Sequence, residues 1–247
     1  MYLDHIVHHV TKTPKEIASD WKEKGFHAVV GGRHTHWGTY NALLYTRTSY
    51  IEWLALEHED IAQKANHPLI NLLLDDLKTK PGFGTICIRT TAIDELCRQL
   101  EEKGIETSGV LQAERKTISG FVRRWKMLFV KEETSDALPT PFFIEWEEND
   151  VERYQTLQED GTIQESNLQL TVSSCEFHVN NPREVMDKWK KYFDLEEEDD
   201  HILLLTNTKL VFTKLENGTK ERLAVVHIDG CTEQGTLIYE QANYRFR

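Results

Sequence analysis

The order of hydrophobic and polar positions at the start of the chain predicts one strand, one helix and three further strands. Residues 2–10 alternate well enough between apolar and polar side chains to predict a strand. Ile17 and Trp21 then follow at helical spacing, after a Thr13 cap whose capping-box partner is Glu16. A strand is expected at 26–30, and a turn at Gly31-Gly32 follows it. Two further strands are expected at 39–47 and 50–56. The first stretch of the chain therefore predicts a βαβββ module.

The same order of elements recurs twice. A second round is expected as a strand at 85–90, a helix capped by Thr91 and ended by Gly104, and strands near 109–113, 122–130 and 142–146. A third is expected as a strand at 170–179, a helix that Asn181 opens, and strands at 201–206, 209–215 and 223–228. The predicted organisation is a first module at 1–57, a helical linker at 58–82, a second module at 83–147, a polar connector at 148–167 and a third module at 168–247.

One tripeptide occurs in the last strand of the first module and again in the last strand of the second. Ile51-Glu52-Trp53 and Ile144-Glu145-Trp146 each place one carboxylate among aromatic and β-branched residues. Burying such a carboxylate costs several kcal/mol unless a metal, an arginine or a proton compensates for it. A single copy is explained as well by an edge strand whose glutamate points to water. The repeat instead indicates two equivalent strands that each carry an inward acid.

A second concentration of polar chemistry lies at residues 33–41. Arg33, His34, His36, Trp37 and Asn41 surround Gly38. This composition suits the rim of a pocket, where His34 or His36 is a candidate general base, Trp37 stacks on a ligand, and Arg33 and Asn41 bind it. The alternative is a hairpin loop with solvated histidines.

Composition narrows the class of protein. The net charge of −12 disfavours nucleic acid and anionic membranes as partners, since both require a basic surface. No apolar run approaches the roughly 20 residues of a membrane span, and no signal segment opens the chain, so we expect a cytoplasmic protein. Cys87, Cys97, Cys175 and Cys231 are widely scattered, which predicts reduced thiols.

These motifs resemble the vicinal oxygen chelate superfamily, which includes glyoxalase I and the extradiol dioxygenases. The segments that carry the resemblance are Leu3-Asp4-His5-Ile6-Val7, residues 31–41 and Tyr50-Ile51-Glu52-Trp53, which look like those of glyoxalase-like domain proteins. The resemblance is most specific over residues 3–56 and only architectural beyond about 147. It implies an α+β fold of repeated βαβββ modules, in which the first two form one curved, cup-like mixed sheet and the third follows at the C-terminus.

The resemblance also implies a metal site inside the cup. Carried over residue by residue, it makes His5, Glu52 and Glu145 the metal ligands. The alternation along the first strand independently places Leu3, His5 and Val7 on one face. The metal would be Zn, Ni, Mn or Fe and would act as a Lewis acid. The fourth position falls near Thr85, where the family has a histidine or glutamine, and Cys87 lies further from the expected geometry.

Two classes of function follow. The first is a metal-dependent lyase, isomerase or dioxygenase that acts on a small oxygenated metabolite, with His34 or His36 as base. The second is a metal-free protein that binds or sequesters a small molecule in the same cup. Four arginine and lysine side chains of the second module either supply a cation for an anionic ligand or are simply solvated: Arg115, Arg123, Arg124 and Lys126.

The third module lacks the Ile-Glu-Trp sequence, and its strands carry more apolar surface than a free module should expose. It is therefore expected either to dock on the first two modules or to pair with the third module of a second chain. The second possibility, a homodimer, is the one that we predict. His178 and His8 are expected to be structural, with His8 meeting a helix.

Overall fold

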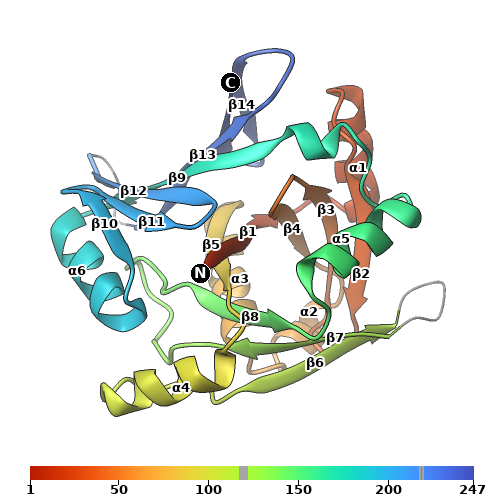
Figure 1. Cartoon of the computed structure of the whole chain (residues 1–247). Helices are drawn as coiled ribbons and strands as arrows, with labels where there is room; N and C mark the ends of the chain where they lie inside the picture. The colour runs from red at the N-terminus through yellow and green to blue at the C-terminus, as the bar shows by residue number, and fades with distance from the viewer. Residues whose placement is uncertain (117–121, 217, 219) are drawn as a thin grey trace.

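Two curled sheets organise the chain (Figure 1). The computed structural model describes residues 1–116, 122–216, 218 and 220–247. The eight-stranded sheet contains the first two βαβββ units, and the seven-stranded sheet contains the C-terminal part of the chain. The predicted α+β class with repeated modules and a curved mixed sheet is confirmed.

The eight-stranded sheet joins two modules through their first strands. Its order is β2 (Val29–His34), β3 (Thr39–Tyr45), β4 (Tyr50–Leu56), β1 (Tyr2–Val10), β5 (Gly82–Arg89), β8 (Phe142–Trp146), β7 (Val122–Leu128) and β6 (Leu111–Lys116). β1 runs antiparallel to β5 and parallel to β4, and β5 runs parallel to β8. Each module therefore has its first strand beside its fourth, and the two first strands form the centre of the sheet.

The helices that follow β1 and β5 begin differently. α1 (Pro14–Glu23) opens with the predicted capping box, in which Thr13 accepts from the Glu16 amide and the Glu16 carboxylate accepts from the Thr13 amide. α4 (Ile93–Glu102) begins one residue later than expected, because its N-cap is Ala92 and the predicted Thr91 cap is wrong. Buried Ile17, Trp21, Ile93 and Leu96 hold both helices against the sheet.

The turn between the second and third strands lies later than predicted. Gly31 and Gly32 are inside β2, at an irregularity in the pairing of β2 with β3. The chain reverses at residues 35–38 instead, where Gly38 has φ +64°. A Cβ at Gly38 would lie 2.3 Å from the His58 carbonyl oxygen, so both the conformation and the space favour glycine there.

The linker between the modules contains two helices, as predicted. α2 (Glu59–Ala62) is short, and α3 (Pro68–Leu77) lies against the inner face of the eight-stranded sheet. Leu69 and Leu73 of α3 belong to the same buried cluster as Val7, Leu54 and Ile144 of the sheet. α3 thus fills much of the cup that the sheet encloses.

The seven-stranded sheet repeats this plan incompletely. Its order is β10 (Glu196–Asp199), β11 (Ile202–Leu205), β12 (Thr208–Lys214), β9 (Thr171–Val179), β13 (Arg222–Asp229), β15 (Ala242–Phe246) and β14 (Gly235–Tyr239). α6 (Pro182–Phe193) opens with the predicted Asn181 cap. The strand predicted at 223–228 is present as β13, but its place as the fourth strand of the third module is wrong. β12 lies parallel to β9 in that place, and β13 begins a further, shorter unit.

The connector is also more regular than expected. It contains α5 (Asp150–Glu159), capped by Asn149, and a single 3-10 turn, η1 (Asn167–Gln169). Leu157 and Ile163 pack on Tyr45 and Tyr50 of the first module, so the segment is held to the eight-stranded sheet. Among the helices of the described ranges, none combines the length and apolarity that a bilayer crossing requires.

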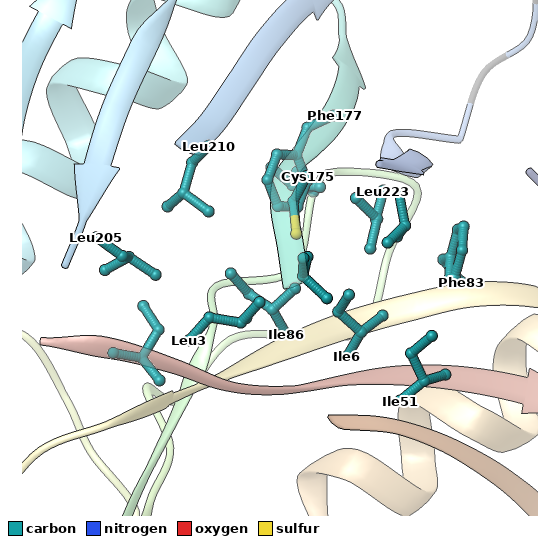
Figure 2. Packing of buried hydrophobic residues seen from close by; sticks show 14 of the residues in the cluster. Leu3, Ile6, Ile51, Phe83, Ile86, Cys175, Phe177, Leu205, Leu210 and Leu223 are labelled. Atoms are coloured by element: carbon teal, nitrogen blue, oxygen red, sulfur yellow. The ribbon is translucent and has the colours of Figure 1, made fainter. Parts of the chain in front are cut away.

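The two sheets pack face to face within one chain. Figure 2 shows Leu3 and Ile6 of β1 and Ile86 of β5 directed toward Cys175 and Phe177 of β9. Further residues of the C-terminal sheet in this core are Leu203, Leu205, Leu210, Phe212 and Leu223, each at most 6% exposed. The apolar face that was expected to form a homodimer is therefore buried inside the chain, and that argument for the dimer is wrong. Docking on the first two modules is the outcome, and a homodimer by another surface stays a prediction.

Candidate functional site

The faces of β1 are set by an irregularity in its pairing with β5, between Leu3 and His5. Leu3 joins the core between the sheets, whereas Val7 belongs to the cup cluster and His5 lines the cup cavity. The expectation that Leu3 shares a face with His5 and Val7 is wrong, because the bulge breaks the simple alternation. His8 faces the C-terminal sheet, where its Nδ1 lies 2.8 Å from the Tyr244 hydroxyl rather than against a helix.

His5 is fixed by a buried carboxylate beside it. Its Nδ1 lies 2.8 Å from Asp4 Oδ1, and Asp4 is fully buried. The other Asp4 oxygen accepts from Arg89 Nη1 and Trp146 Nε1 at 3.0 Å and lies 3.6 Å from Arg153 Nη2. Burial alone would raise the pKa of Asp4, but the His5 hydrogen bond and the charges of Arg153 and Arg89 outweigh it and hold that pKa well below its usual range. Asp4 is therefore ionised, and His5 Nδ1 carries the proton that it donates.

Glu52 is fixed by Asn41. The Asn41 Nδ2 donates to Glu52 Oε1, and the Asn41 Oδ1 accepts from the Gly32 amide at 2.7 Å. A Cβ at Gly31 would lie 2.0 Å from Asn41 Oδ1, so glycine at this position makes room for the amide. Glu52 is 8% exposed, and its orientation into the cup is set by the pairing of Glu52 with Leu43 across β3 and β4.

His5 and Glu52 face each other across a short gap. Their Nε2 and Oε2 atoms are 3.4 Å apart. Its Nδ1 is occupied by Asp4, so Nε2 is the ring nitrogen that faces Glu52 beside the cavity. The pair therefore offers an imidazole nitrogen and a carboxylate oxygen to a ligand in the cavity.

Glu145 is not part of this pair. In β8 the residues that line the cup are Phe142, Ile144 and Trp146, and Glu145 points to the other face. Its carboxylate accepts from the Ile93 amide at 2.7 Å, at the start of α4. The prediction that Glu52 and Glu145 face each other is wrong, because the two Ile-Glu-Trp copies expose opposite faces of their strands: Glu52 points inward in the first, and Trp146 in the second.

The cavity around His5 and Glu52 is small. It measures about 70 Å³ and is walled by aromatic and aliphatic side chains of both modules, and by Leu69 and Ile70 of α3. Arg123 lines it as well; this side chain is 3% exposed and lies 2.8 Å from the Glu148 carboxylate. Its neighbours Arg124 and Lys126 pair with Glu114 and Asp94 on the opposite face of the strand, and the Arg115 side chain lies outside the described residues.

The polar stretch at 33–41 divides between the cavity and the surface. His34, Trp37 and Asn41 line the cavity, which agrees with a pocket rim. Arg33 and His36 are exposed, and Arg33 pairs with Glu57. The expected roles of Arg33 and His36 in the pocket are therefore not supported by their positions.

His67 is a neighbour of the site that the sequence did not reveal. It precedes α3, packs against Trp37 with ring centroids 4.5 Å apart and the rings tilted by 36°, and is 6% exposed. Neither of its ring nitrogens has a hydrogen-bond partner. Burial, followed by the charge of His34, lowers the pKa of His67 to about 4, so its ring is neutral. A His-Pro step before an apolar helix was the only sequence signal for this residue.

The donor set for a divalent metal is incomplete. Within the described ranges, one group of three side chains has metal-binding atoms that all lie within 4.8 Å of one another. This group is Asp4, His5 and Cys87. Asp4 is already bound by two arginines, and burial raises the pKa of the Cys87 thiol well above its ordinary value. The residues present thus do not fit the three-ligand site that the sequence predicted, since Glu145 is absent from it and Thr85 lines a different hollow beside α3.

Comparisons with known proteins fit this architecture. A family model described as a glyoxalase-like domain matches residues 3–193. The chain belongs to this family. The glyoxalase-like domain family lies in the vicinal oxygen chelate superfamily, so the predicted resemblance is confirmed.

Solved structures similar to this glyoxalase-like protein include a hypothetical protein from Staphylococcus aureus, which is 26% identical, covers 100% of this chain and 98% of its own, and has a TM-score of 0.83. A methylmalonyl-CoA epimerase from Mycobacterium tuberculosis is 18% identical with a TM-score of 0.39, over 62% of this chain and 91% of its own. A hypothetical protein from Bacillus halodurans is 17% identical with a TM-score of 0.40, over 60% and 94%. No curated protein matches the sequence.

Proposed function

We propose that the cup of this glyoxalase-like protein binds a compact oxygenated molecule and that Glu52 and His5 exchange protons with it. The observation that carries the proposal is the separation of 3.4 Å between His5 Nε2 and Glu52 Oε2, two groups able to take up and release protons, at the wall of the cup cavity. Asp4 and Asn41 hold the two side chains from behind, so neither has to reorient to meet a ligand. A ligand hydroxyl, or a C–H made acidic by a neighbouring carbonyl, is the group whose proton the pair exchanges.

The cavity volume limits the substrate class. A single water needs roughly 10–15 Å³ of such space, so about 70 Å³ accommodates a ligand of about five non-hydrogen atoms. Three-carbon hydroxy and oxo compounds meet this limit. Glu52 serves as the base that removes the proton, and His5, supported by the Asp4 carboxylate, receives or returns a proton at the ligand oxygen.

The metal-dependent class predicted from the sequence requires a third ligand in addition to His5 and Glu52. Their 3.4 Å separation is compatible with two ligands of one ion, whose bonds to metal are about 2.0–2.2 Å long. The described residues supply no third donor for that pair. We therefore place the proton exchange on the protein side chains, and metal analysis of untagged protein tests this choice.

The experiment follows exchange of the carbon-bound proton in D2O by NMR, with a panel of three-carbon hydroxy and oxo compounds. Glu52→Gln should slow the exchange by about 10²–10⁴-fold, the usual contribution of a general base. Glu145→Gln is the matched control, because the same residue type in the same tripeptide lies on the other face of the sheet, and it should exchange at the wild-type rate. Equal rates in Glu52→Gln and wild type contradict the proposal, whereas one bound metal per chain that disappears in Glu52→Gln supports the metal-dependent class instead.

A further inference from the structure

A second group of titratable side chains lies on the seven-stranded sheet, on the face turned away from the first sheet. Along β9, Cys175 and Phe177 pack into the core between the sheets, so Glu176 and His178 point to the opposite side. His227 comes from β13, which pairs directly with β9. Three side chains with metal-binding groups are thus brought together from two adjacent central strands.

Both imidazoles meet one carboxylate. His178 Nε2 lies 3.1 Å from Glu176 Oε1, and His227 Nε2 lies 3.6 Å from Glu176 Oε2. The Thr213 hydroxyl also donates to Glu176 Oε1, at 3.3 Å. Glu176 thus occupies the centre of the group, with one histidine on each of its oxygens.

We propose that Glu176, His178 and His227 form a binding site for a divalent transition-metal ion such as Zn²⁺. Two nitrogen donors and one oxygen donor are a common ligand set for this ion and leave a position for water. The two imidazoles contact different oxygens of Glu176, so the three donors meet at one ion only when His178, whose side chain is 38% exposed, turns from its present contact toward His227, whose side chain is 6% exposed. The site is independent of the cup, because it lies on the other sheet and on the face directed away from the first sheet.

The test is a calorimetric titration of the full chain with Zn²⁺ and, separately, Ni²⁺ after treatment with a chelator. We expect one ion per chain, with an affinity that falls at least about tenfold in His178→Gln and in Glu176→Gln, because even supporting residues of a metal site contribute that much. His201→Gln is the matched control, since this histidine is exposed on the same half of the chain and should change nothing.

Three results overturn the proposal: no binding by the wild-type chain, binding unchanged in both His178→Gln and Glu176→Gln, or binding lost in Glu52→Gln and retained in the other two. The last result assigns the ion to the cup. His178 and Glu176 are both partly exposed, so their substitution leaves the fold intact, and circular dichroism of each variant verifies this.

Discussion

Replacement of Asp4 by asparagine should destabilise the protein strongly, because this carboxylate neutralises a buried cluster. Asp4 is fully buried, Arg89 is 7% exposed and Arg153 is 1% exposed. Removing one partner from such a group leaves uncompensated buried charge, which costs about 3–5 kcal/mol. For a chain of this size, that loss corresponds to a fall in Tm of roughly 6–20 °C.

The dependence on pH identifies the cause. Because the folded-state pKa of Asp4 is lowered, its stabilisation is fully present above the pKa of an unfolded aspartate, about 3.9, and is lost as the pH falls toward the folded-state value. The difference in unfolding free energy between wild type and Asp4→Asn should thus stay constant from about pH 5 to 8 and shrink below about pH 4. Denaturant titrations at several pH values measure it.

Asp150→Asn is the matched control for Asp4→Asn. Asp150 pairs with the same two arginines, at 3.0 Å from Arg89 and 3.3 Å from Arg153, but its side chain is 49% exposed. Exposed pairs of this kind contribute about 0–1 kcal/mol. An Asp4→Asn variant that loses no more stability than Asp150→Asn would refute the reasoning, as would a difference that does not depend on pH.

Two further predictions concern the core between the sheets and the attachment of α3. Phe177→Ala should lower the free energy of unfolding by about 3–5 kcal/mol in a denaturant titration, because the ring is 1% exposed in the core between the sheets. Ile238→Ala is the control, since this side chain is 69% exposed, and it should lower the free energy of unfolding far less. Similar losses in the two variants would argue against that core. Asp76→Asn should speed amide hydrogen exchange in α3 by roughly 5- to 150-fold, equivalent to about 1–3 kcal/mol, because Asp76 lies 3.0 Å from both His9 Nδ1 and Arg222 Nη2. Unchanged exchange would show that α3 is held by its apolar contacts alone.

The architecture could be predicted from local signals that survive in the fold. The Thr13 capping box, the Asn181 cap and the switches from alternating to helical period mark the module starts, and the structure has helices and strands at these places. The site pair His5 and Glu52 could be found through the family motif. Their neighbour Asn41 was placed in the pocket by composition alone, although its contact with Glu52 depends on the pairing of β3 with β4.

The errors have a common physical origin in strand register. A side chain moves to the other face when a strand shifts by one residue or carries a bulge, and nothing in Ile-Glu-Trp specifies which residue faces inward. Glu145 was therefore assigned to the wrong face, and Leu3 was grouped with His5. The homodimer had a different cause: the apolar residues of the C-terminal strands were recognised, but their partner lies on the outer face of β1 and β5, more than a hundred residues away in the chain.

The difference between the two sheets follows from the linker between the first two modules. α3 enters the cup of the eight-stranded sheet and leaves a small cavity in which Glu52 and His5 are only 8% and 4% exposed. Electrostatic interactions are strong in such surroundings, which suits proton exchange with a compact ligand. On the seven-stranded sheet, α6 packs on the Phe177 face, where Trp189 meets that ring at 5.4 Å, so the Glu176 face has no comparable cover from α6. The Glu176 carboxylate therefore keeps part of its hydration. Histidine and glutamate on this face are better suited to exchange a hydrated metal ion with solvent than to act on a buried substrate.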